Sequence, residues 1–177
     1  KPFHFFADIS AVTAATPLSG EAEALKVSLS QLFIGNMPGC LGETSAVALI
    51  FGAFWLAYKG HIDWRIPGGF LGIVWIMGAL FGGGFYINPV MTGFFHVLAG
   101  GVLLGALFMA TDMVTSPVTP NGKLIFGVGC GLITMLVRLF GAYPEGVTFA
   151  ILTMNALTPL IDKFTIPRKF GEVKRFA

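Results

Sequence analysis

The hydrophobic pattern of the chain is dominated by five long apolar runs. Their approximate limits are Thr44–Tyr58, Ile66–Phe85, Gly93–Thr111, Leu124–Gly141 and Val147–Ile161. About 17 or more consecutive apolar residues are enough for a helix that crosses a bilayer, and the first and last runs, which are short, can extend beyond these limits. The pattern therefore predicts an all-α integral membrane protein with about five transmembrane helices, which form a five-helix membrane domain over residues 44–161.

A shorter helix is predicted ahead of these runs, over Glu21–Ile34. Glu21 and Glu23 fall in its first turn, where the positive end of the helix dipole stabilises acidic side chains. Its apolar positions recur on one face; they are Leu25, Leu29, Leu32 and Phe33. The segment is too short and too polar to span a bilayer, so an interfacial or re-entrant helix is predicted.

The composition supports a membrane protein and excludes several other classes. Hydrophobic residues make up 55% of the 177 residues, charged residues only 11%, and the mean hydropathy is +0.80. Soluble domains carry roughly a quarter charged residues. An ordinary soluble domain, a disordered chain and a nucleic-acid binder are thereby excluded, and the lipid bilayer is the expected surrounding. Cys40 and Cys130 lie far apart in unlike contexts and predict neither a disulfide framework nor a metal site.

The distribution of basic residues predicts the orientation in the membrane. Eight of the eleven basic residues follow the first, third or last run, in regions that alternate onto one face. They are Lys59, Arg65, Lys123, Lys163, Arg168, Lys169, Lys174 and Arg175. The positive-inside rule places this face in the cytoplasm. Residues 162–177 are then a cytoplasmic basic tail, and residues 1–43 lie on the outer, extracytoplasmic side.

Segments rich in Gly and Pro interrupt the apolar runs. They include Asn36–Gly42, Ile87–Pro89 and Thr111–Gly122. Backbone groups freed at membrane depth need protein or water partners, and broken helices of this kind recur in transporters built from inverted repeats. The sequence contains no tandem repeat, and it opens at Lys1 without a Met or a signal-peptide pattern. We therefore expect one half of an inverted-repeat fold, with the N-terminal half of a longer protein absent.

Candidate chemistry begins with a run of small and hydroxylated residues over Thr13–Leu18. Thr13, Ala14 and Ala15 precede Thr16, and their small side chains let the active site of another protein approach its hydroxyl. The run resembles the Ser-Gly-Ala-Thr flavinylation motif, in which a flavin transferase links the phosphate of FMN to the threonine oxygen. Without that resemblance, the segment is interpreted as a surface loop of small residues.

Ionisable residues within or beside the predicted spans form a second group of candidates. Glu43, Asp112 and Asp162 lie at or near span ends, where an acid is a candidate for cation binding or proton relay. Arg138 lies deep in the fourth run. Arg138 has three interpretations. It forms a structural ion pair, it extends to the outer interface, or it binds an anionic ligand such as a flavin phosphate. The Gly-rich turn over Gly35–Ser45 has two interpretations as well, a structural turn or a phosphate-binding helix start.

Taken in order, these segments resemble one family. They are similar to the C-terminal half of the D subunit of the Rnf complex, and of its homologue, the B subunit of the sodium-pumping NADH:quinone reductase. The similarity runs through Thr13–Leu18, Gly35–Ser45, Trp64–Gly69, Phe108–Thr119 and Tyr143–Asp162. Two further stretches, Asn155–Asp162 and Pro167–Gly171, favour the Rnf member. Family members are nearly twice as long as this chain.

The resemblance implies a flavin-carrying subunit of an inner-membrane complex that moves electrons between ferredoxin and NAD and translocates Na+ or H+. Thr16 would carry covalent FMN on the outer side, and riboflavin within the membrane domain is a further cofactor of the family. The other Rnf subunits would be its partners, and this chain alone would hold no complete active site. Urea transporters, with two inverted five-helix halves, have a related fold. A passive transporter or channel for a small polar solute is the alternative, which has no use for a flavin acceptor at Thr16.

Overall fold

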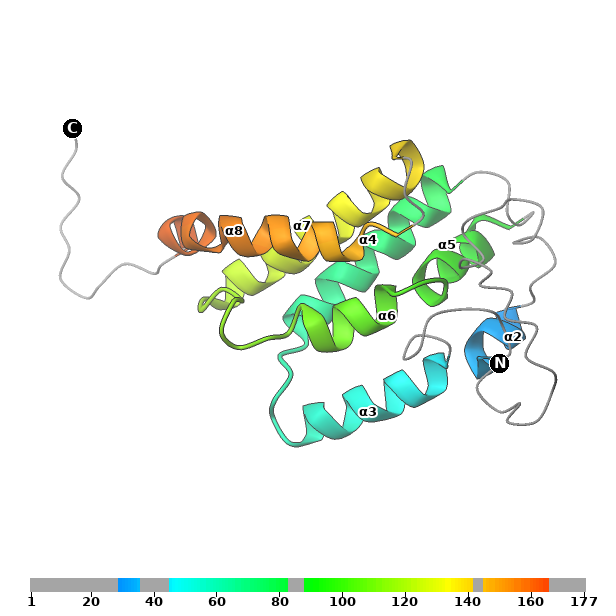
Figure 1. Ribbon diagram of the computed structural model, residues 1–177, viewed down its shortest axis with the longest axis horizontal. Helices are drawn as coiled ribbons and strands as arrows, with labels where there is room; N and C mark the ends of the chain where they lie inside the picture. Colours follow the sequence, from blue (N-terminus) through cyan, green and yellow to red (C-terminus); the bar gives the residue numbers. More distant parts are fainter. Residues whose placement is uncertain (1–28, 36–44, 83–87, 142–144, 166–177) are drawn as a thin grey trace, which may run out of the picture.

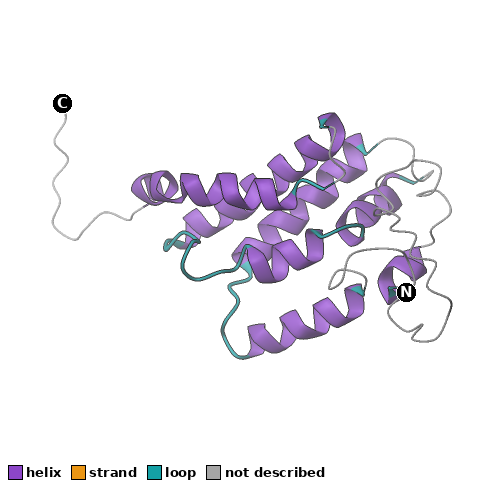
Figure 2. Cartoon of the chain, in the orientation of Figure 1, coloured by secondary structure: helices purple, strands orange, loops and turns teal. Residues whose placement is uncertain are grey.

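The computed structural model describes residues 29–35, 45–82, 88–141 and 145–165, and this part of the chain is helical with no strand (Figures 1 and 2). The elements are α2 (Leu29–Ile34), α3 (Ala46–Tyr58), α4 (Arg65–Phe81), α5 (Pro89–Leu98), α6 (Val102–Leu104), the π-helical turn η2 (Gly105–Met109), α7 (Pro120–Phe140) and α8 (Val147–Thr165). The prediction of an all-α fold is confirmed for these residues. Of the predicted helix Glu21–Ile34, only α2 lies within them.

The lengths of the helices are consistent with a membrane protein. Among the described helices, α7 alone is long and apolar enough to cross a bilayer as a single straight helix. The segment that comprises α5, α6 and η2 meets the same criterion if it is taken as one bent span. Helices α3 and α4 are apolar but shorter. The total of five spans stays a prediction.

Local signals explain where α7 and α8 begin and end. Helix α7 begins four residues before the predicted Leu124, because Thr119 caps it through a hydrogen bond from the Gly122 amide to Oγ1 (3.1 Å) and because Pro120 suits the first helical position. Helix α8 continues past Pro159 to Thr165, beyond the predicted end at Ile161. The first residues assigned to the basic tail are therefore helical.

The third predicted span, Gly93–Thr111, is not one continuous helix. Its helical part starts earlier, at Pro89, and is interrupted after Leu98, so that α5 and the segment Val102–Met109 are bent by 68°. Ala99 is extended, and Gly100 has a φ of 69°, a left-handed conformation that glycine adopts at little cost. The run contains no charged residue at the break, so its hydrophobic pattern predicts one span, although the Gly100–Gly101 pair is a local signal for an interruption.

Helices α4 and α7 are in backbone-to-backbone contact, and they lie next to each other at the centre of the bundle (Figure 1). A Cβ atom at Gly127 would overlap the carbonyl oxygen of Ile66, and one at Gly131 would lie 2.7 Å from that of Phe70. On α4, a Cβ at Gly69 would lie 3.1 Å from the carbonyl oxygen of Leu124. The four-residue spacing of Gly127 and Gly131 is typical of helices that approach closely in membranes.

The main core surrounds this contact. It joins side chains of α4, α6, η2, α7 and α8. Its fully or nearly fully buried members include Ile66, Phe70, Val74, Val102, Ala106, Phe126, Cys130, Met135 and Ile151. Helix α3 lies at the edge of the bundle. Its Ala46 and Ala53 form a smaller cluster with Leu103 of α6 and Leu107 of η2. Most of the tertiary structure therefore depends on the α4–α7 pair.

Substitution of Gly127 tests this dependence. Gly127→Ala places a methyl group against the Ile66 backbone, which cannot move as a flexible side chain can, and overpacking of this kind costs about 1–3 kcal/mol. We expect a lower midpoint of thermal unfolding in detergent. Gly72→Ala on α4 is the matched control, because nothing lies within 4 Å of its added Cβ. An equal midpoint for Gly127→Ala and the control would show that stability does not depend on the close contact between the two backbones.

Candidate functional site

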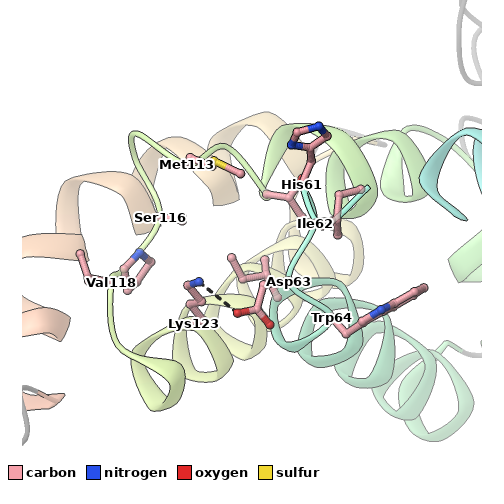
Figure 3. A pocket seen from close by; sticks show the side chains of 12 residues that line it. His61, Ile62, Asp63, Trp64, Met113, Ser116, Val118 and Lys123 are labelled. Atoms are coloured by element: carbon pink, nitrogen blue, oxygen red, sulfur yellow. Dashed lines mark hydrogen bonds and ion pairs between the residues drawn. The ribbon is translucent and has the colours of Figure 1, made fainter. Parts of the chain in front are cut away.

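A cavity of about 510 Å³ lies at one end of the bundle, between the α3–α4 loop and the loop Thr111–Thr119 (Figure 3). Its lining combines charged, hydroxyl and apolar groups, among them His61, Asp63, Thr111, Met113, Ser116 and Lys123. The volume lies within the range of small-molecule sites, which runs from about 300 to 1,000 Å³. The two loops that form it follow the first and the third predicted spans, so the structure brings these loops to the same end.

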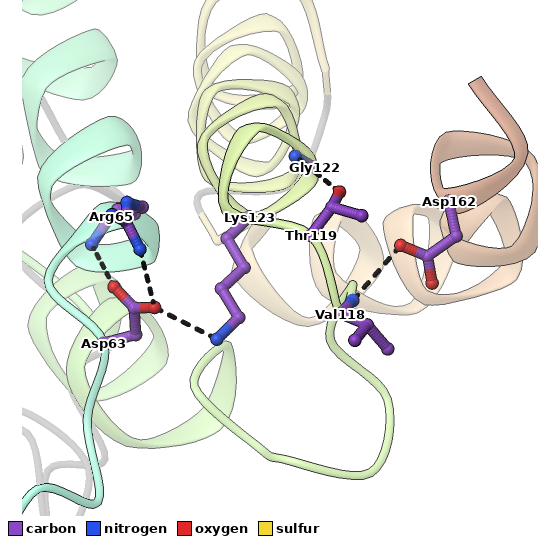
Figure 4. Close-up of polar contacts among 7 residues, drawn as sticks. All are labelled: Asp63, Arg65, Val118, Thr119, Gly122, Lys123 and Asp162. Atoms are coloured by element: carbon purple, nitrogen blue, oxygen red, sulfur yellow. Dashed lines mark hydrogen bonds and ion pairs between the residues drawn. The ribbon is translucent and has the colours of Figure 1, made fainter. Parts of the chain in front are cut away.

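Asp63 joins the α3–α4 loop to the start of α7 (Figure 4). Its Oδ2 accepts a hydrogen bond from Lys123 Nζ at 3.0 Å, and its Oδ1 accepts one from the Arg65 amide at 3.2 Å. A longer ion pair of 3.4 Å joins it to Arg65 Nη1. Partial burial acts to raise the pKa of Asp63, but these hydrogen bonds and the two positive charges outweigh it and hold the pKa below its ordinary value.

The end of α8 holds the second loop through a stripe of polar side chains at helical spacing. Thr158 Oγ1 donates to the carbonyl of Thr115 at 3.0 Å. Asp162 Oδ1 accepts from the Val118 amide at 3.1 Å (Figure 4). Thr165 shares a hydrogen bond with Thr119. The carboxylate predicted as an ion-pathway candidate is thus bound to a backbone N–H group and fixes the loop to α8.

Asp112 lies in the same loop and is exposed. Its two carboxylate oxygens accept from the Val114 amide at 3.4 Å and from Thr115 Oγ1 at 3.2 Å, which forms a local turn. Asp112 and Asp162, two of the three predicted acids, therefore both contact the loop Thr111–Thr119. Neither is paired with a basic side chain among the ion pairs of the described residues.

Arg138 lies at the other end of α7, in its last turn rather than deep in the span. Its Nη1 donates to the carbonyl of His96 at 2.6 Å and its Nη2 to that of Ala99 at 2.9 Å. These carbonyls belong to the end of α5 at the break, where no further helical turn can satisfy them. A cation also suits the negative end of the α5 dipole. The two contacts support the structural interpretation of Arg138, because both terminal nitrogens are used by the break.

His96 is a further polar residue of the break, which the sequence interpretation missed. It is only 3% exposed, and its ring lies against α4. Gly78 and Gly82 leave room for it, since a Cβ at Gly82 would lie 2.6 Å from His96 Nε2 and one at Gly78 3.0 Å from Cδ2. A single histidine in an apolar run, with two glycines four residues apart on the preceding helix, is the sequence signal that could have found this contact.

The flavin-acceptor prediction lies outside the described residues. The structure does not describe the predicted acceptor segment, Thr13, Ala14, Ala15 and Thr16, or the predicted acid Glu43. The sequence interpretation also missed the ion pair of Asp63 with Lys123, because a pairing across 60 positions has no local signal. The described residues contain no group of three or more His, Cys, Asp or Glu side chains that could hold a metal ion.

The described part of this apolar chain is helical, with one broken helix and with polar contacts gathered at the ends of the bundle. These features are consistent with a membrane protein. Comparison with known proteins is more specific. The model of the NQR2, RnfD, RnfE family matches residues 2–171. The chain therefore belongs to the NQR2, RnfD, RnfE family.

Individual relatives agree with this family. The chain is 47% identical to the D subunit of the proton-translocating ferredoxin:NAD(+) oxidoreductase complex of Clostridium ljungdahlii, over 92% of this chain and 52% of that protein. It is 47% identical to the D subunit of the Na(+)-translocating complex of Acetobacterium woodii, over 92% of this chain and 50% of that protein. The D subunit of an ion-translocating oxidoreductase complex of Stutzerimonas stutzeri is 45% identical, over 84% and 42%. The chain spans about half the length of these relatives.

Arg138 provides a test of the helix break. Arg138→Met removes both donors, and each carbonyl left unsatisfied costs about 1–3 kcal/mol. We expect a clear fall in the thermal unfolding midpoint in detergent and in the amount of folded protein. Lys163→Met, which removes an exposed cation from the last turn of α8, is the control and is expected to change little. Equal midpoints for the two variants would contradict the assigned role.

Asp63 provides a test by pH. Because its folded pKa lies below the ordinary value, its contribution to stability is complete above the ordinary pKa of aspartate, about 3.9, and is lost as the pH falls through the folded value. The difference in unfolding midpoint between the wild type and Asp63→Asn is expected to be constant from about pH 5 to 7 and to shrink below about pH 4. A difference that grows on acidification would contradict the sign of the shift.

Proposed function

We propose that this chain is part of the membrane-embedded D subunit of an ion-translocating ferredoxin:NAD+ oxidoreductase complex. The observation that carries the proposal is the 47% identity, over 92% of the chain, to two relatives described as the D subunits of such complexes. The subunit acts as one electron relay within the complex, and the other Rnf subunits are its partners. The relatives from the three organisms are all described as subunits of oxidoreductase complexes, and none as a solute transporter.

The proposed topology has five spans in one half of an inverted-repeat fold. Helices α3, α4, α7 and α8 form four of them, and α5 with α6 and η2 forms the fifth as a broken span. If each of five spans crosses the membrane in turn, the loop after α3, the loop after η2 and the end of α8 lie on the same side. The contacts of Lys123 with Asp63 and of Asp162 with Val118 support this proposal, because they bring these three regions together. The excess of Lys and Arg in these regions assigns that side to the cytoplasm.

The proposed redox group is FMN bound covalently to Thr16, on the outer side, by a flavin transferase. A bound flavin supplies electron transfer, and the chain's part is to hold it at a fixed place among neighbouring redox centres. Arg138 is not needed for the flavin phosphate in this proposal, because its terminal nitrogens donate to His96 and Ala99. Riboflavin within the membrane domain is the second proposed flavin.

The transported ion differs among the relatives of this chain. The two relatives with equal identity to this chain are described with different ions, a proton and Na+. Overall identity therefore does not discriminate between the ions. A few side chains along the ion pathway are enough to decide between a proton and a sodium ion, because the two differ in ligand number and in their need for a titratable group.

Replacement of Thr16 tests the flavin assignment. Thr16→Val keeps the shape of the side chain and removes the oxygen that bonds to phosphorus. In the intact complex, covalent flavin on this subunit is expected to vanish, and electron transfer through the complex is expected to fall steeply. The measurements are in-gel fluorescence of the denatured subunit, mass spectrometry of the peptide that contains Thr16, and the ferredoxin:NAD+ oxidoreductase rate.

Thr13→Val is the matched control and is expected to retain fluorescence at the wild-type level. Fluorescence that persists in Thr16→Val, or that is lost in Thr13→Val alone, would assign the acceptor elsewhere. A wild-type subunit without covalent flavin would contradict the proposed function.

A further inference from the structure

Helix α3 exposes a continuous stripe of large side chains, which we call the α3 outer face. Its members follow the i, i+3, i+4 spacing of one helix face; they are Val47, Ile50, Phe51, Phe54, Trp55 and Tyr58. Phe51 is 73% exposed and Tyr58 77%. The opposite face, with Ala46 and Ala53, packs on the bundle. Figure 1 shows α3 at the edge of the molecule, and among the described residues only Phe33 of α2 shares a hollow with the α3 outer face.

The chemical character of this face changes in one direction along the helix. Val47 to Phe54 are purely apolar, Trp55 and Tyr58 are aromatic with a polar atom, and Lys59 follows as the helix cap. The Lys59 ammonium lies 5.4 Å from the centre of the Trp55 ring. Hydrocarbon, interface and headgroup regions of a bilayer follow each other in the same order, and Trp and Tyr are enriched at the interface.

Two cations at the polar end of α3 keep donors for a ligand. Lys59 makes no hydrogen bond to another side chain among the described residues, and Arg65 uses only Nη1, at 3.4 Å from Asp63. Asp63 is balanced by Lys123, so Lys59 and Arg65 leave an excess of positive charge at this turn. Trp64, 61% exposed, directly precedes Arg65 in the chain.

The apolar end of α3 has a groove of matching chemistry. Phe33 of α2 and Val47, Ile50, Phe51 and Phe54 of α3 line a hollow of about 260 Å³ without any polar lining atom. From Lys59 back to Ile50 is a rise of about 14 Å at 1.5 Å per residue. One leaflet of a bilayer provides about 15 Å of hydrocarbon, half of the roughly 30 Å core. A lipid with its phosphate at the level of Lys59 therefore has its acyl chain alongside this groove.

We propose that the α3 outer face and the α3–α4 turn bind one anionic phospholipid, with its phosphate at Lys59 and Arg65, its glycerol region at Trp55 and Tyr58, and an acyl chain in the Phe33–Phe54 groove. The proposal rests on the membrane location and the cytoplasmic side assigned above. A lipid is favoured over a protein partner by the order of apolar, aromatic and cationic groups along a single helix, because a protein surface imposes no such order. The net positive charge favours an anionic headgroup.

Photo-cross-linking of lipids to the intact complex tests the proposal. The complex is reconstituted in vesicles that contain a trace of phosphatidylglycerol or of phosphatidylcholine, each with a diazirine in its acyl chain, and the labelled peptides are identified by mass spectrometry. We expect phosphatidylglycerol to label the α3 peptide more than phosphatidylcholine, by roughly fivefold for each contributing cation. In the double variant Lys59→Gln with Arg65→Gln the preference is expected to disappear while acyl labelling persists.

Lys163→Gln is the control, because it removes an exposed cation from the same end of the bundle but away from α3, and it is expected to keep the preference. Equal labelling by both lipids in the wild type would mean that the face contacts bilayer lipids without selecting an anionic headgroup, which would overturn the proposal. Absence of labelling by either lipid would mean that protein covers the face and would overturn it too. Covalent flavin is measured on the same samples, so a failure of the proposed function is seen separately from a failure of the lipid site.

Discussion

The close contact between α4 and α7 is the constraint on which the rest of the structure depends. Gly127 and Gly131 lie against the carbonyl groups of Ile66 and Phe70, and no side chain larger than hydrogen fits between the two backbones. Lipid tails are as apolar as a leucine side chain, so helices in a bilayer gain little from hydrophobic burial and depend on close packing of this kind. The core around Phe70, Phe126 and Met135 is built on this pair of helices.

Polar interactions act at the two ends of the bundle, and they solve different problems. At one end, Asp63 with Lys123 holds the α3–α4 loop to the start of α7, and threonine and aspartate side chains of α8 hold the loop Thr111–Thr119 to α8. At the other end, Arg138 satisfies the carbonyls that the break after α5 leaves without a helical partner. A broken helix in an apolar bundle is stable only when such donors are supplied by neighbouring segments. The fold thereby combines a rigid centre with irregular backbone at its periphery.

This architecture is consistent with the proposed role, in which the chain positions a redox group within a larger complex. A flavin relay needs a fixed distance to its neighbours, and a glycine-mediated helix pair provides a frame that deforms little. Helix α3 lies at the edge of the described helices (Figures 1 and 2), and the large side chains of its outer face are exposed. The residues that carry the frame and the residues that face outward are therefore on different helices.

Helical character, approximate helix limits and family were all within reach of the sequence, because hydropathy, capping residues and motif order are local properties. The flavin acceptor Thr16 and the acid Glu43 stay sequence predictions, since they lie outside the described residues. Only the tertiary structure decided that Arg138 binds the carbonyls of His96 and Ala99, and that the run after Gly93 breaks at Gly100. The partners of Arg138 lie about 40 residues away in the chain, so no local pattern identifies them, and the Gly100–Gly101 pair marks where the run can break without determining the bend.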